Sequence, residues 1–599
     1  MDEADRAWWK EATVYQVYPR SFADSDGDGV GDLAGLAARA DYLADLGVDA
    51  VWLNPVYESP MADNGYDVAD YRAIDDTFGT MADWRAVRDA LHERDIRLVM
   101  DFVPNHTSDE HEWFRTSRRR GATADWYHWA DGVDADAVAY DATDEGPAGE
   151  APPNNWRSFF GGPAWAYDDE REQWYLHLFD PKQPDLDWSV PAVREAMYDE
   201  LRYWLDEGID GFRLDVVNLL SKPDGYPSGD PDEPFNGTLR AVPNGPRIHE
   251  YVAEMHDAVF ADRDLLTVGE CIGDTDVDDA ARYVGADGDG LSMVFHFDHV
   301  GIGRGEALWE REEWALTDLK AVFDRWQTGL EGRGWNSLYF NNHDQPRVVS
   351  RFGDDGEYRR ESAACIATLL HTLRGTPYVY QGEELGMTNP TFESLAEFRD
   401  VETVRTVREA IEDGDIDSFE AVREGAERPL ARHQPDADAV DGRPERRLHR
   451  PRRRAVDPPP RGPPRGERRS PAHGPRLGVA LLPAADRPPR GPRRARVRRL
   501  REPHARRRTG VGVQPDAVGR RRPRRRPRPG VRRAQLERGA GARRPARGGR
   551  RRRRDARAVQ LPRGAVAGGG GAVRGTAVGG ARVPGRVTGA PTDTDDTNK

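Results

Sequence analysis

The chain has 599 residues, enough for two or three domains, and its formal net charge of −17 combines two unlike parts. Residues 1–428 contain 90 acidic and 39 basic residues and every aromatic residue, whereas residues 429–599 contain 14 acidic and 48 basic residues and no Phe, Trp, Tyr, Ile, Met or Cys. An acidic surface over an aromatic-rich core does not favour a nucleic-acid partner, and two cysteines suggest no disulfide framework.

The surface and the N-terminus of the first part indicate its cellular setting. Only four lysines occur there, and such an acidic surface is typical of halophilic cells, where salt screens the repulsion between like charges. The segment Met1–Asp5 has no apolar signal region, and no stretch approaches the length of a membrane span. We expect a cytoplasmic, monomeric protein with no membrane partner.

Short apolar runs rich in β-forming residues alternate with amphipathic helical stretches over residues 1–428. The runs are Val14–Tyr18, Ala50–Leu53, Arg97–Phe102, Gly211–Asp215, Leu265–Gly269, Met293–Phe297, Ser337–Phe340 and Tyr378–Tyr380. Helices are expected between them, for example at Leu33–Leu46, Met81–Arg94, Val193–Glu207 and Glu361–Leu373. Eight such alternations predict an α/β fold, a (β/α)₈ TIM barrel made of residues 1–104 and 188–428.

One connection is too long for a simple crossover. Residues 105–187 separate the third and fourth runs and are rich in Trp, Tyr, Asn, Gly and Pro. We interpret them as an inserted small domain that rises after the third strand on the face where a barrel carries its active site.

Charged residues occur where several of these runs end. Arg213 and Asp215 share one face of an apolar strand, an arrangement that is costly to bury unless the two charges meet each other or a substrate. A purely structural Arg–Asp pair would explain this strand alone. Asp101, Glu270 and Asp344 also stand at or just past strand ends, so we predict a site lined with carboxylates at the carboxyl end of the barrel.

Four segments resemble the signature regions of the α-amylase superfamily, glycoside hydrolase family 13. They are DFVPNH at Asp101–His106, GFRLDVVN at Gly211–Asn218, VGEC at Val268–Cys271 and FNNHDQPR at Phe340–Arg347. Further segments are similar to the oligo-1,6-glucosidase and α-glucosidase branch: YQVYPRSF at Tyr15–Phe22, QPDLD at Gln183–Asp187 and GTPYVYQGEELGM at Gly375–Met387.

The resemblance implies the catalytic roles. Asp215 would be the nucleophile, Glu270 the general acid/base that begins the reaction protonated, and Asp344 the acid that stabilises the transition state. Arg213, two residues before Asp215 on the same strand face, is expected to keep Asp215 ionised.

The resemblance also implies the substrate-binding residues. His106 and His343 would donate to sugar hydroxyls, although a lone histidine is more often structural. In DNGYDVADY, Tyr66 would stack on the terminal glucose and Asp63 would bind its outer hydroxyls, where a bare aromatic residue would more often be core. Arg347 completes the predicted set, and Val216 after the nucleophile is typical of branch members that prefer α-1,6 links over α-1,4 links.

The loop DSDGDGVGD at Asp24–Asp32 offers oxygen atoms at alternate positions. It is not an EF-hand, because the twelfth position is Gly35 instead of Glu. It resembles the metal loop of this branch, which implies a structural Ca²⁺ held by Asp24, Asp26, Asp28, the Val30 carbonyl and Asp32. A solvated acidic turn is the alternative. No organic cofactor is implied.

Residues 429–599 are rich in Arg, Pro and Gly and are predicted to be disordered. We interpret them as the product of a one-nucleotide frame shift near residues 426–429, because a single offset can turn Pro435–Gly442 and later segments into motifs of the branch. The shifted tail would replace the last barrel helix and a C-terminal β-sandwich. A basic arm that binds nucleic acid through Arg520–Arg528 and Arg550–Arg554 is the alternative.

These observations predict a retaining, exo-acting α-glucosidase that hydrolyses terminal α-1,6 or α-1,4 bonds of short oligosaccharides. A transglycosylating or isomerising relative, of the trehalose synthase or sucrose isomerase type, is the alternative within the same class. An inactive frame-shifted product and a catalytically dead binding protein are the others, although the complete set of Asp215, Glu270 and Asp344 disfavours the last.

Overall fold

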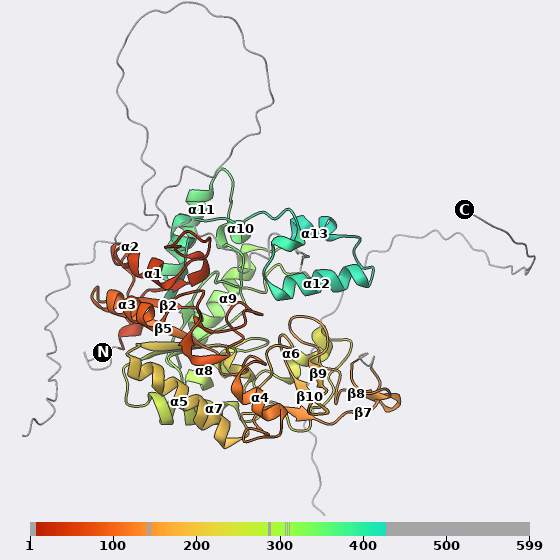
Figure 1. Ribbon diagram of the computed structural model, residues 1–599. Coiled ribbons are helices and arrows are strands. Elements are labelled where there is room, and N and C mark those ends of the chain that lie inside the picture. The colour runs from red at the N-terminus through yellow and green to blue at the C-terminus, as the bar shows by residue number, and fades with distance from the viewer. Residues whose placement is uncertain are drawn as a thin grey trace, which may run out of the picture. The chain divides into compact units, whose positions relative to one another are not determined.

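The computed structural model describes residues 7–426 except 141–144, 285–288, 306, 308 and 311 (Figure 1). The predictions for the frame-shifted tail and for the missing last barrel helix concern residues that lie outside this range. The described residues belong to one unit of the chain, Met1–Ala495.

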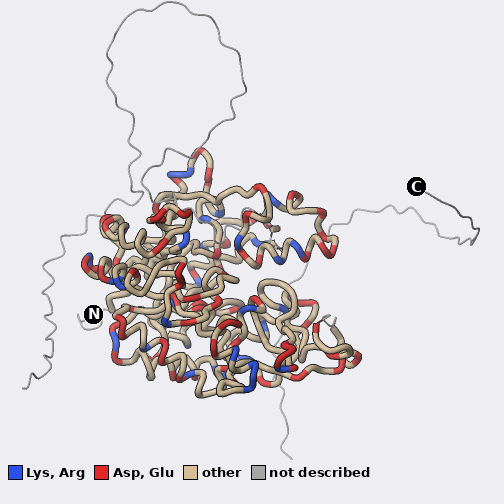
Figure 2. Tube along the Cα trace, viewed as in Figure 1, with Lys and Arg blue, Asp and Glu red and all other residues tan. Residues whose placement is uncertain are grey.

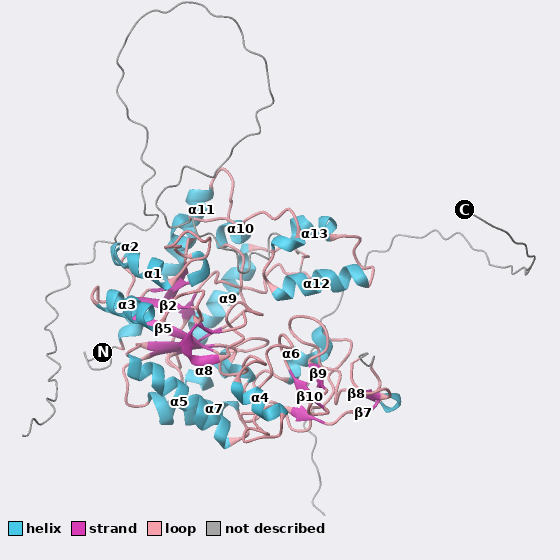
Figure 3. Cartoon of the chain, in the orientation of Figure 1, coloured by secondary structure: helices cyan, strands magenta, loops and turns pink. Residues whose placement is uncertain are grey.

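The described residues form one sheet of eight parallel strands, in the order β13-β12-β11-β5-β2-β1-β15-β14. The two end strands lie side by side, where the Ser337 hydroxyl donates to the Val294 carbonyl at 2.6 Å and the Tyr339 hydroxyl to the His296 carbonyl at 2.7 Å. The predicted (β/α)₈ barrel is therefore confirmed (Figure 3). Its strands are β1 (Val14–Val17), β2 (Ala50–Leu53), β5 (Arg97–Phe102), β11 (Gly211–Leu214), β12 (Leu266–Glu270), β13 (Met293–Phe295), β14 (Ser337–Leu338) and β15 (Thr376–Tyr380).

Alternate residues along each strand face the barrel interior or the helices around it. The interior cluster includes Val14, Ala50, Val99 and Val268, while outward-facing neighbours such as Val51 and Leu98 join a second core beneath the helices. The helices in the described barrel segments are α1 (Leu33–Ala38), α2 (Ala40–Leu46), α3 (Met81–His92), α5 (Pro191–Glu207), α6 (Thr238–Ala241), α7 (Ile248–Met255), α8 (Val277–Val284), α9 (Leu316–Gly329), α10 (Val348–Phe352) and α11 (Arg359–Thr372).

Local sequence signals fix several helix ends. Thr80 and Asp83 form a reciprocal capping box at the start of α3, and Trp84, Val87 and Leu91 face the core from one side of that helix. The expected single helix over Leu33–Leu46 is wrong, because the backbone leaves helical geometry at Arg39. The apolar side continues across the break, so α1 and α2 both remain packed on the barrel.

The segment between β5 and α5 holds small antiparallel sheets in place of a single crossover helix. One sheet has the order β6-β10-β9 and the other pairs β7 with β8. Trp156, Trp165 and Trp174 are fully buried and form its own apolar cluster. Its elements are α4 (Glu112–Arg118), β6 (Trp129–Ala130), β7 (Val133–Asp134), β8 (Glu150–Ala151), β9 (Trp165–Asp168) and β10 (Gln173–Leu176).

Two further pieces lie near the carboxyl end of the barrel. A hairpin of β3 (Tyr57–Glu58) and β4 (Asp70–Ile74) follows β2, and helices α12 (Val401–Glu412) and α13 (Phe419–Ala426) follow β15. The last two helices share a small apolar cluster that includes Phe392, Phe398 and Val407.

Acidic residues are spread along the whole described trace, in keeping with the acidic composition of this part (Figure 2). Cys271 is buried and Cys365 is exposed, and neither forms a disulfide. Among the described residues, no helix combines the length and the apolar character that crossing a bilayer requires.

Candidate active site

The register of the sheet places the predicted acids next to one another. Arg213 on β11 is paired with Asp101 on β5, and Leu214 is paired with Gly269, the residue before Glu270 on β12. Since Asp101, Arg213, Asp215 and Glu270 alternate toward the barrel interior, their side chains meet at its carboxyl end.

Arg213 binds three carboxylates at once. Its Nη1 lies 2.9 Å from Asp101 Oδ1 and 2.6 Å from Asp215 Oδ1, and its Nη2 lies 2.5 Å from Glu270 Oε2. All four side chains are buried. A single guanidinium therefore faces three acids, so the cluster is short of positive charge when every carboxyl group is ionised.

The pKa directions follow from this imbalance. Burial raises the pKa of Asp215 well above its ordinary value, Arg213 opposes the rise, and Glu270 and Asp101 add to it. Burial likewise raises the pKa of Asp101 to about 6, although Arg213 opposes it. Arg213 thus acts in the expected direction, because it favours the ionised form of Asp215, but burial outweighs its effect on the pKa. Burial beside two other acids favours retention of a proton within the cluster.

The backbone after Asp215 is strained. Val216 has φ +33° and ψ +44°, a left-handed conformation that β-branched residues rarely adopt. In this conformation its N–H donates to Glu270 Oε2 at 3.2 Å, and its side chain joins the apolar cluster of the inserted domain. Val216 therefore connects the predicted nucleophile, the predicted acid/base and the inserted domain.

Asp344 and His343 lie in the loop after β14, and Tyr66 faces them. His343 Nε2 lies 2.7 Å from the Tyr66 hydroxyl and 3.4 Å from Asp344 Oδ1. The same hydroxyl donates to Asp101 Oδ2 at 2.9 Å, and the Tyr66 and His343 rings lie parallel. The structure thus brings these predicted residues to the Arg213 cluster.

Asp63 and His106 meet at a second group of contacts, at the base of the inserted domain. Gln183 Nε2 donates to Asp63 Oδ2 at 2.9 Å and lies 3.2 Å from His106 Nε2. Burial raises the pKa of Asp63 well above its ordinary value, and Asp67 adds to the rise. Burial lowers the pKa of His106 to about 4, so its imidazole is neutral near pH 7.

Arg347 is buried against the end of β15 and the loop that follows this strand. Its Nη1 donates to the Gln381 carbonyl at 2.5 Å, its guanidinium lies over the Tyr380 ring, and its backbone N–H donates to Asn389 Oδ1. These two hydrogen bonds tie Arg347 to the loop after β15.

Several residues of the site were not predicted from the sequence. Gln16 contacts His343 Nδ1 at 2.9 Å and Asn54 Oδ1 at 2.8 Å, and the Trp52 indole donates to Asp101 Oδ2 at 3.1 Å. Each of the three lies on or just after β1 or β2, so the rule that selected the acids, a polar residue near the carboxyl end of a strand, also applies to Gln16 and Asn54. Gln183 is the first residue of the QPDLD segment, whose resemblance to the branch is the signal that could have identified it.

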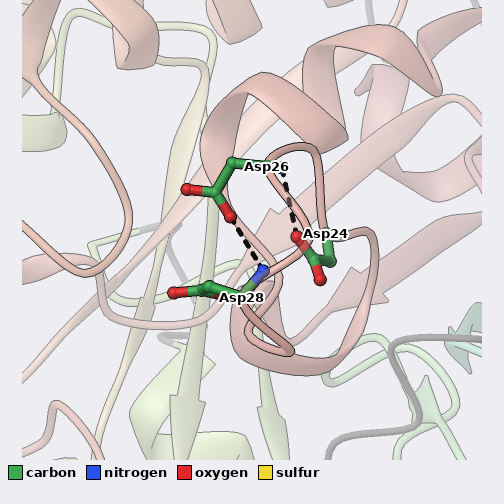
Figure 4. A group of neighbouring side chains, drawn as sticks. All are labelled: Asp24, Asp26 and Asp28. Carbon is green, nitrogen blue, oxygen red and sulfur yellow. Dashed lines mark hydrogen bonds between the residues drawn. The ribbon is translucent and has the colours of Figure 1, made fainter.

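The acidic loop Asp24–Asp32 lies after β1, and carboxylate oxygens of Asp24, Asp26 and Asp28 lie within 4.8 Å of one another (Figure 4). The backbone N–H groups of Gly27 and Gly29 donate to Asp24 and lower its pKa. Asp32 instead caps α1, accepting from Gly35 N at 2.6 Å, and it also accepts from Ser25. Val30 donates its N–H to Asp28. Clustered oxygen atoms are the donor set that Ca²⁺ prefers, so these three residues fit a metal.

Comparison with known proteins decides the family. The family described as "Alpha amylase, catalytic domain" matches residues 16–427. The chain belongs to the α-amylase family. Within it, the chain is 50% identical to the oligo-1,6-glucosidase of Parageobacillus thermoglucosidasius over 414 residues, covering 68% of this chain and 71% of the relative. It is 47% identical to the glucan 1,6-alpha-glucosidase of Streptococcus pneumoniae, with the same coverage. This α-amylase-family chain is thus a glycoside hydrolase.

Solved structures of the family agree with the fold. The trehalose-6-phosphate hydrolase of Bacillus licheniformis matches with a TM-score of 0.63 and 43% identity, over 71% of this chain and 74% of that one. An isomaltulose synthase mutant from Erwinia rhapontici matches with a TM-score of 0.66 and 39% identity, again over 71% and 74%.

Proposed function

We propose that this α-amylase-family enzyme is a retaining, exo-acting α-glucosidase that hydrolyses terminal α-1,6-glucosidic bonds of short oligosaccharides. The observation that supports this proposal is that Asp101, Asp215 and Glu270 all form ion pairs with the buried guanidinium of Arg213. The 1,6-glucosidase names of its relatives support the linkage.

In the proposed first step, an oxygen of Asp215 attacks the anomeric carbon while Glu270 gives its proton to the departing glycosidic oxygen. Retention requires the two carboxyl groups to be about 5–5.5 Å apart, against about 6.5–9.5 Å in inverting enzymes. Asp215 and Glu270 share one guanidinium and are close enough to interact directly, which supports the retaining geometry. In the second step Glu270 takes a proton from water, the water oxygen attacks the anomeric carbon, and the bond from that carbon to Asp215 breaks. Glucose is released with its configuration retained, and Asp215 becomes a carboxylate again.

The charge of the cluster supports catalysis. The transition state carries positive charge on the sugar ring, and a neutral substrate carries none. Three acids around one cation therefore stabilise the transition state more than the ground state. We assign Asp344, beside His343 and Tyr66, to the same role on the other side of the ring.

The residues around Asp63 are proposed to bind the terminal glucose. Asp63 and His106 are buried and already share Gln183, so they would form a closed end that admits a single sugar. A closed end supports exo action. Val216, held between Glu270 and the inserted domain, is proposed to shape the position of the leaving group and to favour α-1,6 links.

The test is product analysis. We expect hydrolysis of isomaltose faster than of maltose, with α-glucose as the first product seen by NMR. Release of β-glucose first would contradict the retaining mechanism. Conversion of sucrose to an isomeric disaccharide without net hydrolysis would instead indicate the isomerising alternative, to which the isomaltulose synthase neighbour belongs.

We also propose a structural Ca²⁺ held by Asp24, Asp26 and Asp28. When bound, the ion would screen the mutual repulsion of these carboxylates and fix the loop that leads into α1. The position of Asp32 as the cap of α1 argues for a role beside the ion rather than as its main ligand.

The frame shift remains a proposal about residues outside the described range. The family match ends at residue 427, where the composition changes from acidic to basic, and this coincidence supports it. The nucleotide sequence across codons 420–440 tests it. A halophilic source is proposed from the excess of acidic residues in residues 1–428, while the monomeric state and the cytoplasmic location stay predictions.

A further inference from the structure

A four-residue turn connects the last described helices to the proposed glucose site. In Asp180–Gln183, the Gln183 N–H donates to the Asp180 carbonyl at 2.7 Å, and the Lys182 N–H donates to Asp180 Oδ1 at 2.8 Å. Asp at the first position and Pro at the second favour such a closed turn. The turn is therefore rigid by its own sequence.

The turn determines how the Gln183 amide faces the site. Gln183 is fully buried, and its Oε1 accepts from the Asp180 N–H at 3.0 Å. Because the amide oxygen is engaged there, the amide nitrogen must face Asp63 Oδ2 and His106 Nε2. A displaced turn would move or rotate the donor that Asp63 now receives.

Arg405 on α12 holds this turn from outside. Its Nη2 lies 2.6 Å from Asp180 Oδ2, the carboxylate oxygen that the turn itself leaves free. A second contact, from Asn64 Nδ2 to the Arg399 carbonyl at 3.4 Å, joins the residue after Asp63 to the chain just before α12. The first half of α12 and the chain just before it thus contact both segments that carry the proposed glucose-binding residues.

The Arg405–Asp180 ion pair can be removed by substitution without disturbing a hydrophobic core. A cleft of about 650 Å³ separates α12 from the inserted domain, and Arg405, Arg408, His177 and Pro181 line it. The Arg405 side chain is 31% exposed, whereas that of Asp180 is 10% exposed. Removal of the guanidinium would leave the Asp180 carboxylate without its external partner and would loosen the turn.

We propose that Arg405 is a positioning residue for the closed end of the glucose pocket. By holding Asp180, it fixes the Gln183 amide against Asp63 and His106. This inference rests on the proposed function, since it takes Asp63 and His106 as glucose-binding residues. These contacts are remote from the reacting bond, so they act equally on the bound substrate and the transition state and change KM rather than kcat.

The test uses the full chain and a matched pair of variants. We expect Arg405→Met to raise KM for isomaltose about tenfold, with kcat changed less than twofold, because a charge-assisted contact is lost. Arg408→Met is the control, since Arg408 lies on the same helix, lines the same cleft, is exposed and makes no ion pair within the described part of the chain.

Two further variants separate positioning from simple stabilisation. Asp180→Asn should raise KM as Arg405→Met does, the double variant should add nothing, and Arg405→Lys should restore most of the affinity. A role in stability alone would lower the melting temperature and leave KM unchanged. An unchanged KM in Arg405→Met, or equal effects of Arg405→Met and Arg408→Met, overturns the proposal.

The outcome can be distinguished from failure of the proposed function. If the unaltered chain does not hydrolyse isomaltose, the proposed function fails, and glucose binding by titration calorimetry replaces KM. Weaker binding in Arg405→Met than in Arg408→Met then still supports positioning by Arg405. Equal binding in both variants, or no glucose binding by the unaltered chain, overturns it.

Discussion

Two buried ion clusters of this enzyme differ in their balance of charge. In the barrel, Arg213 serves Asp101, Asp215 and Glu270. At the base of the inserted domain, Lys222 Nζ lies 2.7 Å from Asp185 Oδ1 and 2.7 Å from Asn105 Oδ1. Both cations are 1% exposed. The second cluster pairs one charge with one charge, whereas the first leaves two acids uncompensated.

The difference separates a structural site from a reactive one. A balanced buried pair is satisfied at rest, and breaking it leaves an isolated charge. A cluster with excess negative charge is neutralised only when one of its acids gains a proton or a positively charged ligand binds. The Arg213 cluster is therefore the one suited to stabilise a cationic transition state. Loss of a charge from this cluster and loss of a charge from the Lys222 cluster should change the free energy of unfolding in opposite directions.

The largest expected effect comes from removal of the proposed nucleophile. Asp215→Asn should lower kcat by roughly 10⁴-fold or more while the free energy of unfolding stays the same or rises, because one of three acids on Arg213 is neutralised. Initial rates on isomaltose and a urea titration measure both quantities. Retained turnover in a correctly folded variant would refute the assignment of Asp215.

Substitution in the Lys222 cluster should lower the free energy of unfolding. Lys222→Met strands the Asp185 carboxylate in the interior and should lower the free energy of unfolding by about 3–5 kcal/mol. The double variant with Asp185→Asn is the control, and it should recover part of the loss. If Lys222→Met is as stable as the unaltered chain, the two clusters do not differ as described.

The two clusters should also respond oppositely to acid. The pKa of Asp101 is raised to about 6, mainly by burial, so the folded state binds its proton more tightly than the unfolded state does. Its contribution to stability should therefore increase as the pH falls from above 6 toward about 4.

The pKa of Asp185 is shifted in the opposite direction. Burial opposes its ionisation, but Lys222, His106 and the Leu178 N–H together outweigh burial, and the pKa of Asp185 is lowered. Its contribution is present above the ordinary value of about 3.9 and is lost as the pH falls through the lower folded pKa. Urea titrations from pH 7 to pH 3 should show a maximum near pH 4–5, and Asp101→Asn should flatten the rise between pH 6 and 4. A monotonic fall from pH 7 would contradict this account.

The smallest effect concerns a third group of acids, in the loop after β1. If Asp24, Asp26 and Asp28 bind Ca²⁺, added CaCl₂ should raise the melting temperature by a few degrees, and EDTA should reverse the change. Asp26→Asn should abolish the response, and MgCl₂ serves as the control ion. Equal responses in the Asp26→Asn variant would assign the effect to general screening of the acidic surface.

The sequence was sufficient to predict the barrel and to place Asp101, Asp215 and Glu270 near the ends of neighbouring strands. The ends of all eight strands lie within two residues of their predicted bounds. Polar residues on either side of each continuous apolar run leave little choice of where the strand begins and ends. The acids follow from their place at strand ends. The break at Arg39 carried no Pro or Gly signal and was missed.

What the sequence did not predict depends on contacts between distant residues. The pKa direction of Asp215 reflects burial beside Asp101, which stands 114 positions earlier and meets it only through the pairing of β5 with β11. Lys222 and Asp185 are unremarkable in the sequence until the inserted domain folds back on the barrel. The Arg405–Asp180 pair joins residues 225 positions apart.

The order of strands has a consequence for synthesis of the chain on the ribosome. One edge of β1 is covered early by β2, but the other edge is covered by β15, at residues 376–380. At about 5–20 residues per second, that edge stays open for roughly 20–70 s after it emerges. An unpaired strand of Val14–Val17 is a template for aggregation during this interval, so translation speed and chaperone capacity should set the yield of native enzyme.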